Sequence, residues 1–393
     1  MSASAHDYER IPYLVVFEDD SAYRDTYGGV TESVVLESYL LRPTGVPSDT
    51  AILFMHPIGG GAYLPMSNAL ARAGHHVIYA NSRYRGVDSA LIMEKVVQDL
   101  GAAMRDARER LGYRNVILGG WSGGGALSLY YQQQAQHATV TATPAGDPPD
   151  LTRLDLPPAD GVMLLAAHVS RHGTLTEWID PAVVDESDPT RRDPELDLYD
   201  PRGPNRPPYS ADFLARYRAA QIARNRRITA WVKDELAGLR GRGEELLERA
   251  FVVHGTMADP RWLDPTIDPN DRTPGRCYLG DPRIVNMGPV GLARFSTLRS
   301  WLSQWSLDDA LGDGPRCAAD LTVPTLVIGN SADDACTPSH TQRLFDAVGH
   351  ADKELHTIPG ATHYYSGAAQ VPHLNAAVER ITTWMGERSW TTF

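Results

Sequence analysis

The residues with the clearest chemical meaning are Gly120-Trp121-Ser122-Gly123-Gly124, a G-x-S-x-G motif. An apolar stretch precedes the motif and a helix-compatible stretch follows it, which predicts a strand, a sharp turn and a helix. A serine at such a turn is held in a strained conformation with its hydroxyl projecting from the sheet edge, and the glycines let strand and helix pass closely. The neighbouring amides lie at a helix N-terminus, which favours negative charge. The motif therefore predicts a nucleophilic Ser122.

The segments around this motif predict a sheet covered by helices. Residues 11–42 alternate between apolar and polar runs, as in one or two antiparallel hairpins. Further strands are predicted at residues 51–55, 76–80, 116–118, 161–166, 324–329 and 354–358, and helices at residues 62–73, 88–111, 340–348 and 373–386. Because apolar strands alternate with helices along the chain, the expected class is α/β, with a mostly parallel sheet and helices on both faces.

The alternation stops between about residues 169 and 320. This stretch is rich in Pro and Asp, contains several Trp and is too long for a plain loop. A helix is predicted at residues 210–239, with Ser210 as its N-cap. We therefore expect a core formed by residues 1–168 and 321–393, and a large insertion at residues 169–320.

Composition excludes several classes of protein. The chain has 393 residues, of which 42% are hydrophobic and 22% charged, and its net charge of −12 disfavours nucleic-acid binding. The three cysteines show no disulfide or zinc-site spacing, and no metal-ligand pattern stands out among the histidines, so no metal is expected. No secretory signal or membrane-spanning segment is visible. The expected protein is cytoplasmic and soluble, acts on a small-molecule substrate without membrane partners, and could form a homodimer.

The motif, the order of elements and the long middle segment resemble the α/β-hydrolase superfamily over residues 33–168 and 321–390. The resemblance implies that the middle segment is a cap inserted after the sixth strand, mainly helical in such enzymes. It also implies a catalytic triad in the chain order nucleophile, acid, histidine. Ser122 matches the nucleophile, and His363, in a G-x-x-H loop after the last strand, matches the base.

The resemblance places the acid after the penultimate strand, where two aspartates are candidates. The superfamily usually has its acid three residues after a glycine and four before a proline. Asp334 has the expected spacing to Pro338, whereas Asp333 is closer to the expected spacing from Gly329. We favour Asp333 and keep Asp334 as the alternative, because neither fits both spacings.

The resemblance also predicts an oxyanion hole, a pair of N–H groups that stabilises the charged oxygen of the intermediate. The N–H of Gly123 is the first candidate donor. The second is expected in the loop after the third strand, where Pro57 stands in place of the usual glycine and has no N–H. Ile58 is therefore the preferred second donor, with Gly59 behind it, and His56 is expected to support this loop.

These assignments predict a serine hydrolase that cleaves a carboxylic ester or a related carbonyl compound through an acyl-enzyme, without a cofactor. An amidase, thioesterase, acyltransferase or carbon–carbon bond hydrolase on the same fold remains open, as does an inactive relative that only binds ligands. Cap residues are expected to set specificity.

Some conspicuous residues have a structural explanation that we prefer over a functional one. Arg83 follows the fourth strand and could bind a substrate carboxylate, but a structural ion pair is the favoured interpretation. Arg224 and its neighbouring arginines are expected on the solvent face of a cap helix. The tryptophans of the middle segment could line a pocket or pack the cap's own core.

Overall fold

The computed structural model describes residues 5–19, 21, 32–59, 61 and 64–391. Within them, one eight-stranded sheet has the order β1-β2-β4-β3-β5-β6-β9-β10. The bounds of these strands are β1 Tyr8–Glu18, β2 Ser33–Pro43, β3 Thr50–Phe54, β4 His76–Ala80, β5 Asn115–Ser122, β6 Gly161–Ala167, β9 Thr325–Asn330 and β10 Lys353–Ile358. β1 and β2 pair antiparallel as one hairpin, β2 pairs antiparallel with β4, and the other neighbours are parallel. This mostly parallel sheet confirms the predicted α/β class. The carboxyl ends of its parallel strands meet at one edge.

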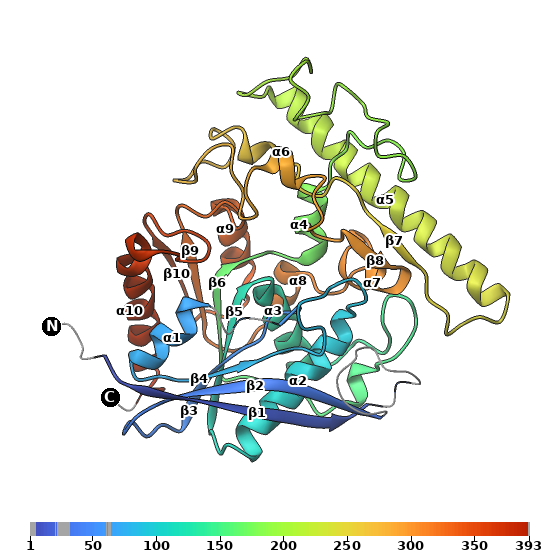
Figure 1. Cartoon of the computed structure of the whole chain (residues 1–393). Helices are drawn as coiled ribbons and strands as arrows, with labels where there is room; N and C mark the ends of the chain where they lie inside the picture. Colours follow the sequence, from blue (N-terminus) through green and yellow to red (C-terminus); the bar gives the residue numbers. More distant parts are fainter. Residues whose placement is uncertain (1–4, 20, 22–31, 60, 62–63, 392–393) are drawn as a thin grey trace.

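Helices cover both faces of this sheet (Figure 1). Their bounds are α1 Pro65–Arg72, α2 Met93–Glu109, α3 Gly123–Gln136, α8 Gly314–Ala318, α9 Pro338–Ala347 and α10 Val371–Glu387. α1 and α10 pack with one buried apolar cluster, and α2, α3, α8 and α9 pack with the other. The sheet therefore has a hydrophobic core on each side, which fixes the positions of its strand ends.

Two predicted helices begin later than expected. The helix predicted at residues 88–111 starts at Met93, because residues 88–91 form a turn closed by the Leu91 N–H on the Asp88 carbonyl. The helix predicted at residues 62–73 starts at Pro65, and the prediction for residues 62–63 lies outside the described part of the chain. Proline at the first helical turn has a fixed φ that suits a helix start.

The segment between β6 and β9 lies over the carboxyl edge of the sheet (Figure 1). Its elements are α4 Arg171–Trp178, α5 Ala211–Gly241, α6 Pro282–Val285, α7 Leu298–Gln304 and a two-stranded ribbon of β7 Ala250–Val252 and β8 Phe295–Thr297. Four of its tryptophans, Trp178, Trp262, Trp301 and Trp305, are at most 1% exposed. Trp301 and Trp305 pack in a buried cluster formed mostly by this segment, whereas Trp178 and Trp262 pack in one that also contains Ala335 and Cys336.

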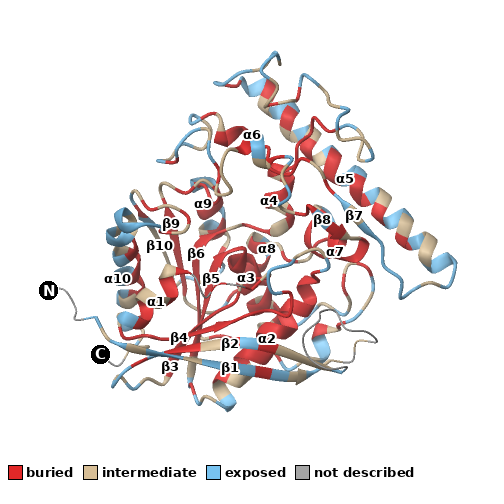
Figure 2. Cartoon of the chain, viewed as in Figure 1, coloured by how far each residue is buried: buried red, intermediate tan, exposed pale blue. Residues whose placement is uncertain are grey.

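α5 is the dominant helix of this segment, and Figure 2 shows that one of its faces is buried and the other exposed. Ser210 caps it as predicted, since its side chain accepts a hydrogen bond from the Phe213 N–H. The prediction for Arg224 is wrong: its side chain is 1% exposed and binds Glu186 and three backbone carbonyls. Arg224 lies seven residues after Tyr217, on the same buried stripe of the helix.

The described part of the chain contains no helix with both the length and the apolar character required to cross a bilayer.

Candidate active site

Ser122 is the last residue of β5 and immediately precedes α3. Its φ of 54° and ψ of −126° are a strained combination for a residue with a side chain. A Cβ at Gly120 would lie 2.7 Å from the Gly125 Cα, so the strand and the helix pass too closely for any other residue there. The motif therefore builds the strand–turn–helix arrangement that the sequence predicts.

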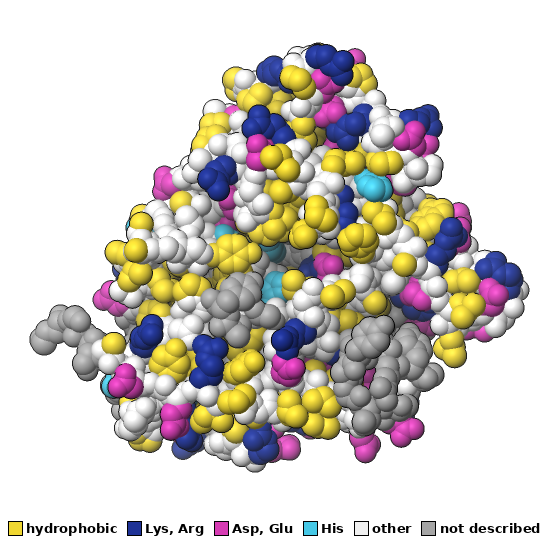
Figure 3. Space-filling model, viewed as in Figure 1, with side chains coloured by type: hydrophobic (Ala, Val, Ile, Leu, Met, Phe, Trp, Pro, Cys, Tyr) yellow, Lys and Arg dark blue, Asp and Glu magenta, His cyan; other side chains and the backbone are white. Residues whose placement is uncertain are grey.

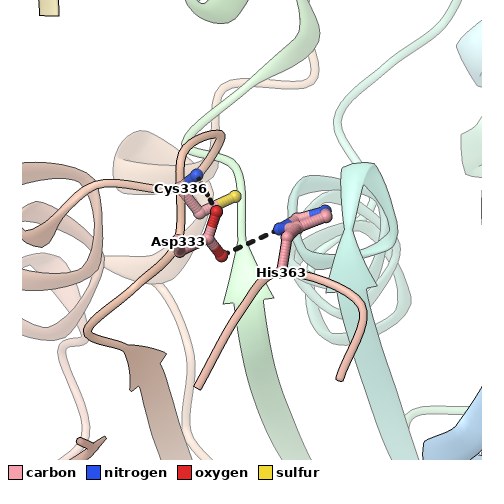
Figure 4. Close-up of side chains that lie close together, drawn as sticks. All are labelled: Asp333, Cys336 and His363. Atoms are coloured by element: carbon pink, nitrogen blue, oxygen red, sulfur yellow. Dashed lines mark hydrogen bonds and ion pairs between the residues drawn. The ribbon is translucent and has the colours of Figure 1, made fainter. Parts of the chain in front are cut away.

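His363 and Asp333 converge on Ser122 from the neighbouring strand ends. Oγ of Ser122 lies 3.2 Å from Nε2 of His363, and Nδ1 of His363 lies 2.8 Å from Oδ2 of Asp333. Asp333 follows β9 and His363 follows β10, and Figure 4 shows the two side chains pointing toward each other. Oδ1 of Asp333 also accepts hydrogen bonds from the N–H groups of Ala335 and Cys336, at 2.7 and 2.8 Å, which fix its orientation.

Asp334, the alternative acid, is not hydrogen-bonded to His363 within the described residues. Its backbone carbonyl accepts a hydrogen bond from Nε1 of Trp262 at 2.7 Å. Burial and the neighbouring charge of Asp333 raise the pKa of its carboxyl to about 6. Of the two candidates, the structure brings Asp333 within hydrogen-bond distance of the histidine.

Two further histidines, His56 and His168, line the pocket in front of Ser122. Burial, followed by the charges of Arg171 and His363, lowers the pKa of His56 to about 3. Burial and the surrounding cations also lower the pKa of His168 well below 6.5. By contrast, burial lowers the pKa of His363, but the charge and hydrogen bond of Asp333 together with the charge of Asp334 outweigh it, so the pKa lies above 6.5. The protein therefore favours a positive charge on only one of the three imidazoles.

The candidate oxyanion donors have different surroundings. Gly123 is the first residue of α3, where an N–H has no acceptor within the helix, and it lines the pocket. The N–H of Ile58 donates to Nδ1 of His56 over 3.3 Å, and that of Gly59 donates to the His56 carbonyl over 2.8 Å. His56 thus supports the loop, and the longer bond leaves Ile58 as the donor that can more easily be shared with a ligand.

Asp333, Cys336 and His363 place potential metal-binding atoms within 4.8 Å of one another, the arrangement drawn in Figure 4. A metal requires a thiolate and an unbound imidazole nitrogen. Burial, Asp333 and Asp334 raise the pKa of the Cys336 thiol well above its usual value, and Nδ1 of His363 is already bonded to Asp333. We therefore assign the cluster to the Ser122 site and not to a metal.

The pocket beside Ser122 has a volume of about 250 Å³. Figure 3 shows a hollow on this face, with histidine side chains in it and hydrophobic side chains around it. Sequence reasoning did not name several residues that line this pocket, among them His168, Arg171 and Tyr278. His168 had a usable signal, because it directly follows β6 at the carboxyl edge of the sheet, whereas no local pattern marks Tyr278.

Arg83 does not reach this pocket. Its side chain is 2% exposed, and Nε donates to Oδ1 of Asp99 over 2.9 Å, so the structural interpretation is correct. Trp121 lies beneath the site, where its Nε1 donates to the His363 carbonyl over 3.3 Å.

Comparisons with known proteins agree with this architecture. A family model described as the alpha/beta hydrolase fold matches residues 50–160, and one described as serine aminopeptidase, S33, matches residues 306–366. A search of curated proteins found no match to the sequence.

Solved structures resemble the chain at low identity. The structure of DcsB in complex with its substrate analogue is 11% identical, with a TM-score of 0.50 over 95% of this chain and 99% of that one. The siderophore hydrolase EstB from Aspergillus fumigatus is 13% identical, with a TM-score of 0.49 over 90% of this chain and 94% of that one. Est1E from Butyrivibrio proteoclasticus is also 13% identical, with a TM-score of 0.45 and the same coverage. From its sheet topology and the two family-model matches, the chain has the α/β-hydrolase fold.

Proposed function

We propose that this protein is a serine hydrolase that cleaves a carboxylic ester through an acyl-enzyme. The observation that carries the proposal is the connected series of Ser122, His363 and Asp333, with contacts of 3.2 and 2.8 Å. The two matching family models support it, because their ranges contain all three residues. Hydroxyl, imidazole and carboxylate in this order are the groups needed to activate a serine.

In the first half of the reaction, Oγ of Ser122 attacks the ester carbonyl while Nε2 of His363 takes its proton. Asp333 stabilises the imidazolium that forms. The carbonyl oxygen becomes negative and accepts hydrogen bonds from the N–H of Gly123 and of Ile58, each worth roughly 3–4 kcal/mol in the transition state. His363 then gives its proton to the departing alcohol, and Ser122 holds the acyl group as an ester.

In the second half, water replaces the alcohol. His363 takes a proton from this water, whose oxygen attacks the acyl carbonyl, and then returns that proton to Oγ of Ser122 as the acid leaves. The neutral state of His56 and His168 suits both halves, since a second cation next to His363 would oppose its protonation.

We propose that residues 1–168 and 321–393 form the catalytic core and residues 169–320 the cap. The cap contributes pocket-lining residues that include Arg171, Tyr278 and Leu292. A pocket lined in part by the cap is more enclosed than an open surface, which favours selective binding of the substrate.

The test uses a fluorophosphonate probe, which reacts covalently with activated serines, together with p-nitrophenyl esters of increasing chain length. We expect the wild-type protein to be labelled at Ser122 and to hydrolyse at least one short ester. Ser122→Ala should abolish both, while Ser128→Ala, a buried serine in α3, serves as the control. Absence of labelling and of turnover in the wild type would rule out the proposal.

A further inference from the structure

One ion pair, Asp88 with Arg171, lies in the wall of the catalytic pocket. Nη2 of Arg171 donates to Oδ2 of Asp88 over 2.9 Å. Apart from histidine, these two are the charged side chains among the described residues that line the pocket. Most of the remaining wall is aromatic, aliphatic or glycine, so the pair is the main polar feature facing a substrate away from Ser122.

Arg171 is held in place from two sides. It is the first residue of α4, its side chain is 10% exposed, and its guanidinium lies over the ring of Trp305 at 4.3 Å from the centroid. Trp305 is completely buried in the cap, whereas Asp88 belongs to the loop before α2 of the core. A guanidinium fixed in this way is preorganised, so binding a ligand costs little conformational entropy at this side chain.

The ion pair leaves hydrogen-bonding capacity unused. A guanidinium and a carboxylate commonly make two parallel bonds, but here a single one is formed within the described residues. Nε of Arg171 is buried and has no acceptor there. Asp88 offers acceptor atoms beside these donors, since its carboxylate has two oxygens and its side chain is 28% exposed. Because Arg171 and Asp88 both line the pocket, its wall presents guanidinium donors beside carboxylate acceptors.

We propose that Asp88 and Arg171 select substrates that carry a hydroxyl group. The hydroxyl oxygen accepts a hydrogen bond from the guanidinium, and the hydroxyl hydrogen is donated to the carboxylate. This inference rests on the proposed ester hydrolysis at Ser122 and names the substrate class for it.

The alternatives fit the pair less well. A substrate carboxylate would be attracted by Arg171 but repelled by Asp88, whose charge neutralises the arginine. A purely apolar group would remove water from both charges without replacing its hydrogen bonds, which is unfavourable. Sites built to bind a hydroxyl discriminate strongly against analogues that lack it, because their buried polar groups then stay unpaired.

The experiment compares p-nitrophenyl esters of one chain length: hexanoate, 3-hydroxyhexanoate, 6-hydroxyhexanoate and the monoester of hexanedioate, which ends in a carboxylate. We expect kcat/KM for one of the hydroxylated esters to exceed that for hexanoate by about tenfold or more. The kcat/KM for this hydroxylated ester should also exceed the kcat/KM for the hexanedioate ester. This preference should fall by about the same factor in Arg171→Met and in Asp88→Asn.

The ratio of two substrates within one variant cancels any general loss of activity. Arg249→Met is the matched control, because Arg249 also lies over a cap tryptophan, Trp231 at 5.5 Å, and does not line the catalytic pocket. Its ratio should equal that of the wild type. Thermal unfolding and fluorophosphonate labelling report whether each variant is folded. If Arg171→Met does not fold, Asp88→Asn alone tests the inference.

Two results would overturn the inference: no preference for either hydroxylated ester, or a preference that both substitutions leave intact. A preference for the hexanedioate ester would also contradict it and would make Arg171 a carboxylate site. These results differ from a failure of the proposed function, in which no ester is hydrolysed and Ser122 is not labelled, and which would remove the basis of the inference as well.

Discussion

The carboxylate of Asp333 lies 2.8 Å from Nδ1 of His363 and is completely buried, whereas the adjacent Asp334 bonds through its backbone carbonyl to Trp262. Two consecutive aspartates thus make separate contacts, one with the histidine and one with a tryptophan of the segment between β6 and β9. The backbone N–H groups of Ala335 and Cys336 add to this difference, because they bind only the first carboxylate.

Asn substitution of each aspartate should separate these roles. We expect Asp333→Asn to lower kcat by about 10⁴, since the amide no longer holds the imidazole in its tautomer or stabilises its charge. Asp334→Asn should lower kcat by less than about tenfold, because the side chain of Asp334 makes no hydrogen bond to His363. Steady-state kinetics on one ester measure both, and comparable losses in the two variants would contradict the assignment.

The pH dependence of kcat/KM should follow His363. The ion pair with Asp333 raises its pKa above 6.5 in spite of burial, and the imidazole must be neutral to accept a proton. Activity should therefore rise with pH through an apparent pKa above 6.5. In Asp333→Asn burial remains and the ion pair is lost, so the same limb should move to lower pH. A limb that stays in place in this variant would mean that another group titrates.

The second oxyanion donor can be tested by removing a single N–H. Ile58→Pro deletes the amide hydrogen that now bonds to His56, and we expect kcat to fall by about 10²–10³. Ile58→Ala retains the N–H and is the control. If the two variants lose the same amount of activity, with unfolding temperatures equal to that of the wild type, then Ile58 does not supply the donor.

The close approach of β5 and α3 predicts a stability difference between two glycines. Gly120→Ala brings its Cβ to 2.7 Å from the Gly125 Cα, and we expect a loss of about 1–3 kcal/mol in the free energy of unfolding, together with lower activity. Gly241→Ala, at the end of α5, has no atom within 4 Å of its Cβ and should be neutral or stabilising. Chemical denaturation measures both, and an equal effect would contradict the packing argument.

Glu94 couples stability to pH. Burial raises the pKa of this carboxyl to about 7, although hydrogen bonds from Ser303 and Tyr130 oppose the rise. Since the folded state binds the proton more tightly than the unfolded state, stability should decrease as the pH rises from about 4.5 to about 7, by up to roughly 3 kcal/mol. Glu94→Gln imitates the protonated form and should flatten this dependence. Unfolding curves at pH 5 and pH 8 test it.

Much of the core was predictable because its patterns are local. The motif at Ser122 and the apolar runs of the strands depend on neighbouring residues, and His363 follows the last strand. The choice between Asp333 and Asp334 could not be made from spacing alone, since an additional loop residue shifts both, and it depends on which carboxylate reaches the histidine.

The segment between β6 and β9 was harder to predict because tertiary contacts determine its structure. Arg224 looks like a solvent-facing residue by type, yet its position on the buried stripe of α5 and the carbonyls around it place it inside. The pairing of Arg171 with Asp88 joins residues 83 positions apart, and Trp305 completes the arrangement from still farther along the chain. Helical periodicity could have indicated the burial of Arg224, but no local pattern indicates the pairing of Arg171 with Asp88.

Ser122 ends β5, and Asp333 and His363 lie in the loops after β9 and β10. The segment between β6 and β9 contributes walls of the pocket but none of these three side chains. In the proposed function, the reactive groups are therefore encoded outside residues 169–320, whereas recognition is shared between that stretch and core residues such as Asp88. Natural variation within the intervening stretch can alter what is recognised while the reactive groups stay in place, which gives such a protein freedom to acquire new substrates during evolution.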